Sequence, residues 1–245
     1  MNRITREGIK NVVREHYAHL ALGTSDCCHD AQVLETSYPA QELATLPEAV
    51  TAAAAGCGNP LALAHLQTGE VVLDLGSGGG IDCFLAARAV GPQGLVLGVD
   101  MTLEMVALAT RNARLVRAEN VRFILGDMEH LPLAEGMVDL IVSNCVINLS
   151  PDKDAVFAEA FRVLKPGGRL YVSDILLERE LPPKVRQDPL HWASCIAGAE
   201  LQGIYLGRME AVGFREIKVL QRTPYRPEEL PGILSAQLQA RKPPR

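Results

Sequence analysis

The sequence lacks long apolar runs, and it lacks an excess of basic residues. No stretch approaches the roughly 18 to 20 consecutive apolar residues of a membrane-spanning helix, and the first ten residues hold no apolar signal-peptide core. We therefore expect neither a membrane span nor a signal peptide, and we expect a cytoplasmic location. The formal net charge is −5 over 245 residues. The chain thus offers no basic surface to a phosphate backbone, and nucleic-acid binding is not expected.

Paired cysteine spacing is also missing. The chain has six cysteines but no C-x-x-C or C-x-C pair, which disfavours a structural zinc site. Without a secretory signal, the six cysteines do not indicate a disulfide framework either. Cys83 falls within a predicted helix and is interpreted as structural, although a helix N-terminus could lower its pKa. The other five lie at predicted loop or lid positions that give a cysteine no packing role: Cys27, Cys28, Cys57, Cys145 and Cys195.

An apolar run followed by a glycine-rich turn is the most informative feature present. Residues 71–75 read Val-Val-Leu-Asp-Leu, and Gly76-Ser-Gly-Gly-Gly80 and a helix-like stretch over 81–90 follow them. A strand, turn and helix of this kind bring backbone N–H groups close to a nucleotide-type ligand. A dinucleotide site needs a third glycine where Ile81 stands, so a pyrophosphate is not favoured. The motif resembles the S-adenosylmethionine site of Rossmann-like methyltransferases.

Strand-like and helix-like runs alternate from residue 71 onward, which is typical of βαβ units and a parallel sheet. The expected strands are 71–75, 95–99, 121–125, 138–143, 169–176, 213–220 and a closing antiparallel strand at 235–241. We therefore expect an α/β, Rossmann-like methyltransferase fold with a mostly parallel seven-stranded sheet and helices on both faces. It should form one compact unit: an N-terminal helical segment over 1–70, the cofactor-binding core over 71–180, and lid helices with closing strands over 181–245.

Three local predictions concern helices. Residues 5–22 place apolar residues at helical spacing, which predicts an amphipathic helix packed on the outside of the sheet. Ser150 precedes Pro151, a pattern that predicts a capping hydroxyl before proline at the first helical position. Residues 182–203 are expected to form a mainly helical insertion.

The cofactor candidates follow the first four predicted strands. Asp100 ends the second strand at about the distance where a carboxylate accepts hydrogen bonds from a ribose diol. Asp127 could pair with the adenine amino group, and Met101 or Met128 could lie against the ring; ordinary surface and core roles are the alternatives. The full set is Asp74, Gly76, Ser77, Gly78, Gly80, Asp100, Met101, Asp127, Met128 and Asn144.

Cys145 directly follows the fourth predicted strand, where a doubly wound sheet binds its ligand, so its thiol would face the methyl donor. A role as a small buried apolar residue is the alternative. His191 and Cys195 are four residues apart, and on one helical face the imidazole would favour a thiolate, although coincidence is the simpler interpretation. The polar residues expected to shape the same edge of the sheet are Asn144, Asn148, Ser173 and Asp174.

Several motifs together resemble the arsenite S-adenosylmethionine methyltransferases, over about residues 12–219. Many methyltransferases share the glycine motif, whereas three cysteine motifs are more selective: Gly56-Cys-Gly-Asn-Pro60, Asn144-Cys145 and Cys195-Ile-Ala-Gly198. The resemblance implies that the thiolates of Cys57, Cys145 and Cys195 hold trivalent arsenic, and that Cys27 or Cys28 takes part in a redox cycle. Sulfur ligands suit soft As(III). Three of them leave one lone pair, which we infer attacks the sulfonium methyl in line.

The resemblance further implies an arsenic-detoxifying enzyme. It would use S-adenosylmethionine as cofactor and a glutathione- or thioredoxin-type thiol reductant as co-substrate, and we expect it to be a monomer. Two other functions remain open. A small-molecule methyltransferase acting on a quinone would share the cofactor site but need a catalytic base instead of thiols. A non-catalytic thiol protein that sequesters metal would keep the fold without turnover, although the intact cofactor motif argues against it.

Overall fold

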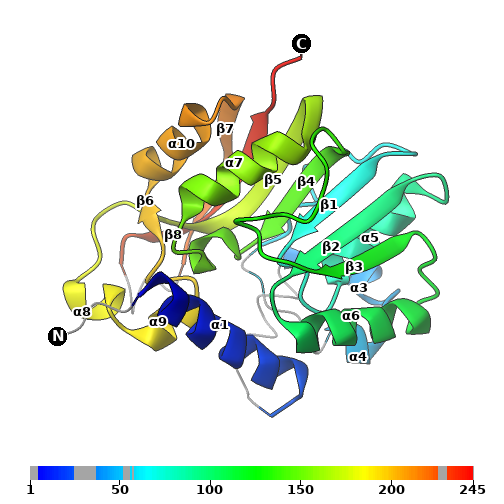
Figure 1. The fold of residues 1–245 in the computed structure, drawn as a ribbon, viewed down its shortest axis with the longest axis horizontal. Coiled ribbons are helices and arrows are strands. Elements are labelled where there is room, and N and C mark those ends of the chain that lie inside the picture. The colour runs from blue at the N-terminus through cyan, green and yellow to red at the C-terminus, as the bar shows by residue number, and fades with distance from the viewer. Residues whose placement is uncertain (1–4, 25–36, 52–55, 57, 226–230, 245) are drawn as a thin grey trace.

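One mixed sheet runs through the protein, with helices on both faces (Figure 1). The computed structural model describes residues 5–24, 37–51, 56, 58–225 and 231–244. The strands are β1 (Val71–Leu75), β2 (Leu95–Asp100), β3 (Val121–Leu125), β4 (Val138–Asn144), β5 (Leu164–Leu177), β6 (Glu200–Leu201), β7 (Arg215–Pro224) and β8 (Ile233–Arg241). The seven predicted strands and the α/β class are confirmed, and the two-residue β6, paired with β5, is an addition.

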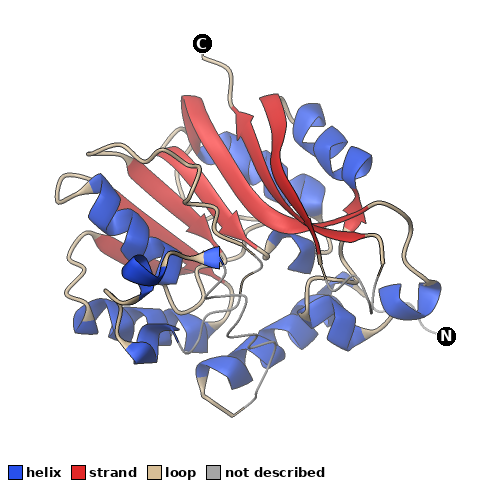
Figure 2. Cartoon of the chain, turned by 180° about the vertical axis from the view of Figure 1, so that it is seen from behind, coloured by secondary structure: helices blue, strands red, loops and turns tan. Residues whose placement is uncertain are grey.

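The strand order places β1 and β4 side by side in the sheet. The order is β3-β2-β1-β4-β5-β8-β7, and the red strands of Figure 2 show the sheet as one continuous surface. Strands β1 to β5 pair in parallel, whereas β8 is antiparallel to both β5 and β7, as predicted. After β1 the chain adds β2 and β3 on one side of it, and then crosses over to add β4 and β5 on the other side. The carboxyl ends of β1 and β4 therefore flank the topological switch point, where such sheets bind ligands.

Alternate strand residues face two different cores. The helices that cover the sheet are α5 (Ile81–Val90), α6 (Leu103–Leu115), α7 (Lys153–Val163) and α10 (Gln202–Ala211). In β1, Val72 belongs to the buried cluster that contains Phe84 of α5. Its neighbour Leu73 belongs to the cluster that contains Phe157 of α7 and Tyr205 of α10. The alternation follows from the period of two along a strand, and it explains why strands buried on both sides appear as continuous apolar runs.

The N-terminal helix α1 (Arg6–Ala21) is capped by Thr5, whose hydroxyl accepts from the Gly8 amide at 3.1 Å. Its apolar side packs on α6 and on α9 (Pro189–Ala193), in a cluster that joins Val13 to Leu149 and Ile196. The prediction that this helix packs on the outside of the sheet is therefore wrong. It lies across the edge where the parallel strands end.

Two further predictions need correction. Helix α7 is capped by Asp152, whose carboxylate accepts from the Ala155 amide. Ser150 does not cap it, because the helix begins only at Lys153: the Ser150 hydroxyl accepts from the Asp152 amide at 2.9 Å, ahead of the helix, and donates to Glu129. The insertion over 182–203 is only partly helical, since the short helices α8 (Pro183–Arg186) and α9 are followed by a turn and by β6.

Three short helical segments complete the described chain: α3 (Ala40–Leu43), α4 (Glu48–Thr51) and the 3-10 turn η1 (Ile147–Leu149). Within the described ranges, no helix combines the length and the apolar character needed to cross a membrane.

Candidate functional site

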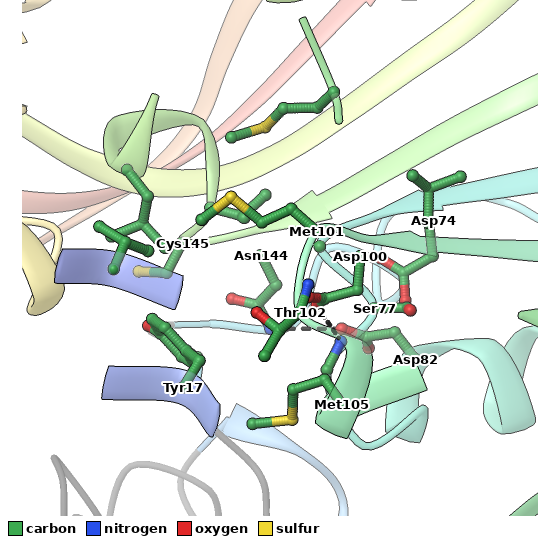
Figure 3. A pocket seen from close by; sticks show the side chains of 18 of the residues that line it. Tyr17, Asp74, Ser77, Asp82, Asp100, Met101, Thr102, Met105, Asn144 and Cys145 are labelled. Carbon is green, nitrogen blue, oxygen red and sulfur yellow. Dashed lines mark hydrogen bonds between the residues drawn. The ribbon is translucent and has the colours of Figure 1, made fainter. Parts of the chain in front are cut away.

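A solvent-open cleft of about 1240 Å³ lies at the carboxyl ends of β1, β2 and β4. The cofactor candidates that line it are Asp74, Gly76, Ser77, Gly78, Asp100, Met101, Asp127, Met128 and Asn144. Figure 3 shows Cys145 and Tyr17 at one end of the cleft and Asp74 and Asp82 at the other. The predicted cofactor residues are thus brought together, with one exception.

That exception is Gly80, which does not line the cleft. It precedes α5 with a φ of 95°, and a Cβ there would lie 2.8 Å from ring atoms of both Phe84 and Phe123. A side chain at this position would therefore disturb the packing of two aromatic rings that meet edge to face. Packing, rather than contact with a ligand, requires a glycine at this position.

The Asp100 carboxylate at the end of β2 is held by backbone amides. Its Oδ2 accepts from the Gly78 amide at 3.0 Å, and its Oδ1 accepts from the Thr102 amide at 2.9 Å. Burial raises the pKa of Asp100, although these hydrogen bonds oppose the shift. Each carboxylate oxygen retains a further lone pair, so the group can still accept hydrogen bonds from a diol.

Asp74 ends β1 in a buried environment that it shares with Cys83. The Cys83 thiol donates to Asp74 Oδ2 at 3.3 Å, and burial raises the pKa of both groups well above their ordinary values. Cys83 is therefore held as a thiol, and the suggestion that the helix N-terminus lowers its pKa is wrong. Nearby, the Ser77 hydroxyl is buried and has no hydrogen-bond partner among the described residues. A polar atom of this kind in a cleft is available to a ligand.

A buried network that the sequence did not predict joins four chain segments. The Tyr38 hydroxyl donates to Asp82 at 2.8 Å, and the Asn144 amide donates to the Tyr38 hydroxyl at 3.0 Å and to the Gly58 carbonyl at 2.7 Å. Burial raises the pKa of Asp82 to about 6. The position of Asp82 in the first turn of α5, directly after the glycine turn, was the available signal. The network fixes the end of β4 against the segment that begins at Gly58.

Lys10 of α1 occupies the space between two acidic residues that follow β3. Its ammonium lies 2.6 Å from Asp127 and 2.5 Å from Glu129. Burial alone would raise the pKa of Asp127, but the hydrogen bonds from Lys10 and from the Glu129 amide, together with the positive charge of Lys10, outweigh it, and the pKa is lowered. Asp127, Glu129 and His130 are close enough to hold a metal ion. However, the Lys10 ammonium already pairs with both carboxylates, so we interpret the cluster as an ion-pair network.

Cys145 and Cys195 are in contact although they are 50 residues apart in the sequence. The Cys195 thiol donates a hydrogen bond to the Cys145 carbonyl. Both are buried, and both have left-handed backbones, with φ of 58° and 64°. Such conformations are strained for a residue with a side chain, and they cluster at functional sites. Cys145 is disulfide-bonded, whereas Cys195 carries a reduced thiol. The other thiol candidates, Cys27, Cys28 and Cys57, lie outside the described residues.

The suggested helical pairing of His191 with Cys195 is wrong. Helix α9 ends at Ala193, so the two side chains do not lie on successive turns of one helix. The His191 Nδ1 lies 2.9 Å from the carboxylate of Asp188 instead.

Asn148 and Asp174 do not line the cleft. They lie beneath the segment that carries Cys145 and hydrogen-bond to each other. Asp174 accepts from the Asn148 amide at 2.9 Å and from the Tyr205 hydroxyl at 3.0 Å, and burial raises its pKa to about 6. These bonds anchor the η1 turn that follows Cys145. Gly198 packs on the same turn so closely that a Cβ there would lie 1.9 Å from the Asn148 carbonyl oxygen. The segments that carry Cys145 and Cys195 are thereby held together.

Comparison with known proteins agrees with this arrangement. The methyltransferase domain family matches residues 66–220. The arsenite methyltransferase of Halobacterium salinarum is 38% identical over 98% of the chain, which spans 68% of that protein. The arsenite methyltransferase of Aquipseudomonas alcaligenes is 43% identical over 83% of the chain, which spans 60% of that protein.

A solved structure gives the same result. The crystal structure of an arsenic(III) S-adenosylmethionine methyltransferase from Chlamydomonas reinhardtii superposes with a TM-score of 0.73 at 36% identity, covering 83% of this chain and 72% of that one. The expected fold, cofactor and family are confirmed together. The chain belongs to the arsenite methyltransferase family of S-adenosylmethionine-dependent enzymes.

Proposed function

We propose that this chain transfers a methyl group from S-adenosylmethionine to trivalent arsenic held by the thiolates of Cys57, Cys145 and Cys195. The observation that carries the proposal is the contact of Cys195 with Cys145, which lines the end of the cleft, with both residues in strained conformations. Residues 71–180 would then hold the cofactor, while 1–70 and 181–245 supply thiols and cover the site. The proposal takes the enzyme to be a cytoplasmic monomer.

The cleft fits the cofactor in charge and in hydrogen-bonding capacity. Asp74, Asp82 and Asp100 all line it, and burial raises the pKa of each, which indicates that a bound cation would relieve their desolvation. Asp100 would accept from the ribose hydroxyls, and the unpaired Ser77 hydroxyl offers a further contact. Asp127 would accept from the adenine amino group, with Met101 or Met128 against the ring. When bound, S-adenosylmethionine supplies an electrophilic methyl group on a sulfonium.

The thiols would hold arsenic by ligand exchange. Each exchange forms one As–S bond, and the thiol proton leaves with a hydroxide ligand of arsenous acid as water. Sulfur is preferred because As(III) is soft. The apolar cluster around Cys145 and Cys195, which includes Leu149 and Ile196, would limit the access of water to these bonds.

A thiol reductant belongs to the proposal for two reasons. Cys145 is disulfide-bonded in the structure and must be reduced before it can bind arsenic. Methyl transfer also takes arsenic formally from As(III) to As(V), so two electrons must be returned for a further round. A glutathione- or thioredoxin-type thiol would supply them, with Cys27 or Cys28 relaying the exchange.

The test is incubation of the reduced protein with arsenite, a thiol and S-adenosylmethionine, followed by arsenic speciation. Methylated arsenic formed in proportion to S-adenosylhomocysteine is expected. Arsenic binding without methyl transfer would support sequestration instead. Transfer to a quinone, with none to arsenite, would support the small-molecule methyltransferase.

Replacing Asp100 with alanine is expected to weaken S-adenosylmethionine binding by about tenfold or more, because the ribose donors lose a held acceptor in a desolvated site. Calorimetric titration measures the affinity. Glu104→Ala, which removes an acidic residue in the first turn of α6 outside the cleft, is the matched control. Equal affinity in the Asp100→Ala and Glu104→Ala proteins would show that the ribose assignment is wrong.

A further inference from the structure

Helix α1 presents one side to the cofactor cleft. Lys10, Val13 and Tyr17 all line the cleft, and their spacing of three and four residues places them on a single face of the helix. Lys10 lies at the Asp127 end of this face, whereas the Tyr17 hydroxyl reaches the carbonyl of Ala193, two residues before Cys195. The helix therefore spans the cleft from the loop after β3 to the segment that carries Cys195.

Lys10 is held in a largely buried network. Its side chain is 13% exposed, that of Glu129 is 8% exposed and that of Asp127 is 35% exposed. Glu129 is fixed in turn by the Ser150 hydroxyl at 2.5 Å. Since an ion pair shielded from solvent costs much more to break than an exposed one, this contact constrains both α1 and the loop after β3.

The same contact sets the position of the Asp127 carboxylate. Its Oδ1 accepts from the Glu129 amide at 2.9 Å, and its Oδ2 accepts from Lys10. Without the ammonium, the negative charges of Asp127 and Glu129 would repel each other, and the more exposed Asp127 would turn toward solvent. With the ammonium in place, Asp127 keeps a fixed orientation and a free lone pair on each oxygen.

We propose that Lys10 is a positioning residue that holds Asp127 as the acceptor for the adenine amino group, so that α1 contributes to recognition of the base. This inference rests on the proposed function, because it takes the cleft to hold S-adenosylmethionine. A fixed carboxylate accepts from the amino group of adenine and repels the carbonyl oxygen that replaces it in hypoxanthine. Lys10 should therefore control the preference for one base over the other.

Calorimetry with two ligands tests this: S-adenosylhomocysteine and S-inosylhomocysteine, in which an oxo group replaces the amino group. The wild-type protein should prefer the adenosyl compound by about tenfold or more, the usual effect of one lost hydrogen bond in a desolvated site. In Lys10→Met the preference should fall to within about threefold. Lys10→Arg, which keeps the charge, should restore most of it.

The control is Arg14→Met, which removes a cation from the same helix whose side chain bonds only to Asn11 of that helix among the described residues. It should keep the wild-type preference. If Lys10→Met does not fold, Lys10→Met/Glu129→Gln, which removes one of the two carboxylate charges left without a cation, is measured in its place. An unchanged preference, or an equal loss for both ligands, would overturn the inference. Failure of the wild-type protein to bind S-adenosylhomocysteine would instead overturn the proposed function.

Discussion

Replacing Cys145 with serine should lower methyl transfer to arsenite by about 100-fold or more while leaving the affinity for S-adenosylmethionine near that of the wild type. Serine replaces a soft ligand with a hard, protonated hydroxyl. The remaining thiolates then no longer fix arsenic relative to the methyl donor, and misplacement by about 1 Å can cost about 100-fold in rate. Arsenic speciation measures turnover, and calorimetry measures cofactor binding. Cys195→Ser should behave in the same way.

Cys83→Ser is the matched control, since this thiol is buried beside Asp74 and is not one of the proposed arsenic ligands. Of the cysteine variants, it should lower methyl transfer to arsenite the least.

Cys27→Ser and Cys28→Ser should differ both from this control and from the variants of the proposed arsenic ligands. If either thiol serves the redox cycle, its variant should lose turnover of arsenite yet keep some activity on methylarsonous acid, which needs fewer thiol exchanges. Full activity in Cys145→Ser or Cys195→Ser would rule out the three-thiolate mechanism.

Replacing Gly198 with alanine should nearly abolish arsenic binding without removing the cofactor site. The added Cβ would lie 1.9 Å from the Asn148 carbonyl oxygen and 2.8 Å from the Trp192 ring. The Asn148 carbonyl belongs to the backbone and cannot move aside as a flexible side chain would. The segment carrying Cys195 must therefore move away from η1 and from Cys145. Overpacking of this kind typically costs about 1 to 3 kcal/mol of stability. Arsenite titration of the reduced protein, beside calorimetry with S-adenosylmethionine, separates the two effects.

Gly207→Ala is the control for this variant. Gly207 lies within α10, and a Cβ there meets nothing within 4 Å. Because alanine favours a helix over glycine by about 0.5 to 1 kcal/mol, this control should be as stable as the wild type or more so. Wild-type arsenic affinity in Gly198→Ala would show that the contact with Asn148 does not set the distance between the two thiols.

Sequence patterns predicted the central strands well because those strands are buried on both sides. Runs such as residues 71–75 are apolar apart from Asp74, and glycine or proline interrupts the chain between them. The position of α1 could not be predicted in this way. Periodicity indicates that a helix has an apolar face, but not which surface that face meets. The prediction for the cap of α7 was wrong because the helix begins at Lys153, which puts Asp152 in the capping position, while the Ser150 hydroxyl donates to Glu129, 21 residues away.

The site was predictable where its residues belong to one local motif. Asp74, Gly76 and Gly78 follow a single strand, and Asp100 follows the next one along the chain. The partners that position these residues come from distant segments: Tyr38 lies 44 residues from Asp82. No local pattern carries such information, since only the folded sheet edge brings these side chains together.

The placement of β8 also has a consequence for how the protein is made. β8 lies between β5 and β7 and hydrogen-bonds to both, and among the described strands it is the only partner of β7. Residues 215–224 nevertheless leave the ribosome before residues 233–241. Until β8 emerges, the edge of β5 stays open and β7 has nowhere to pair, and exposed strand edges invite pairing with other chains. A nascent chain stalled in this interval is therefore more prone to aggregate than the finished protein.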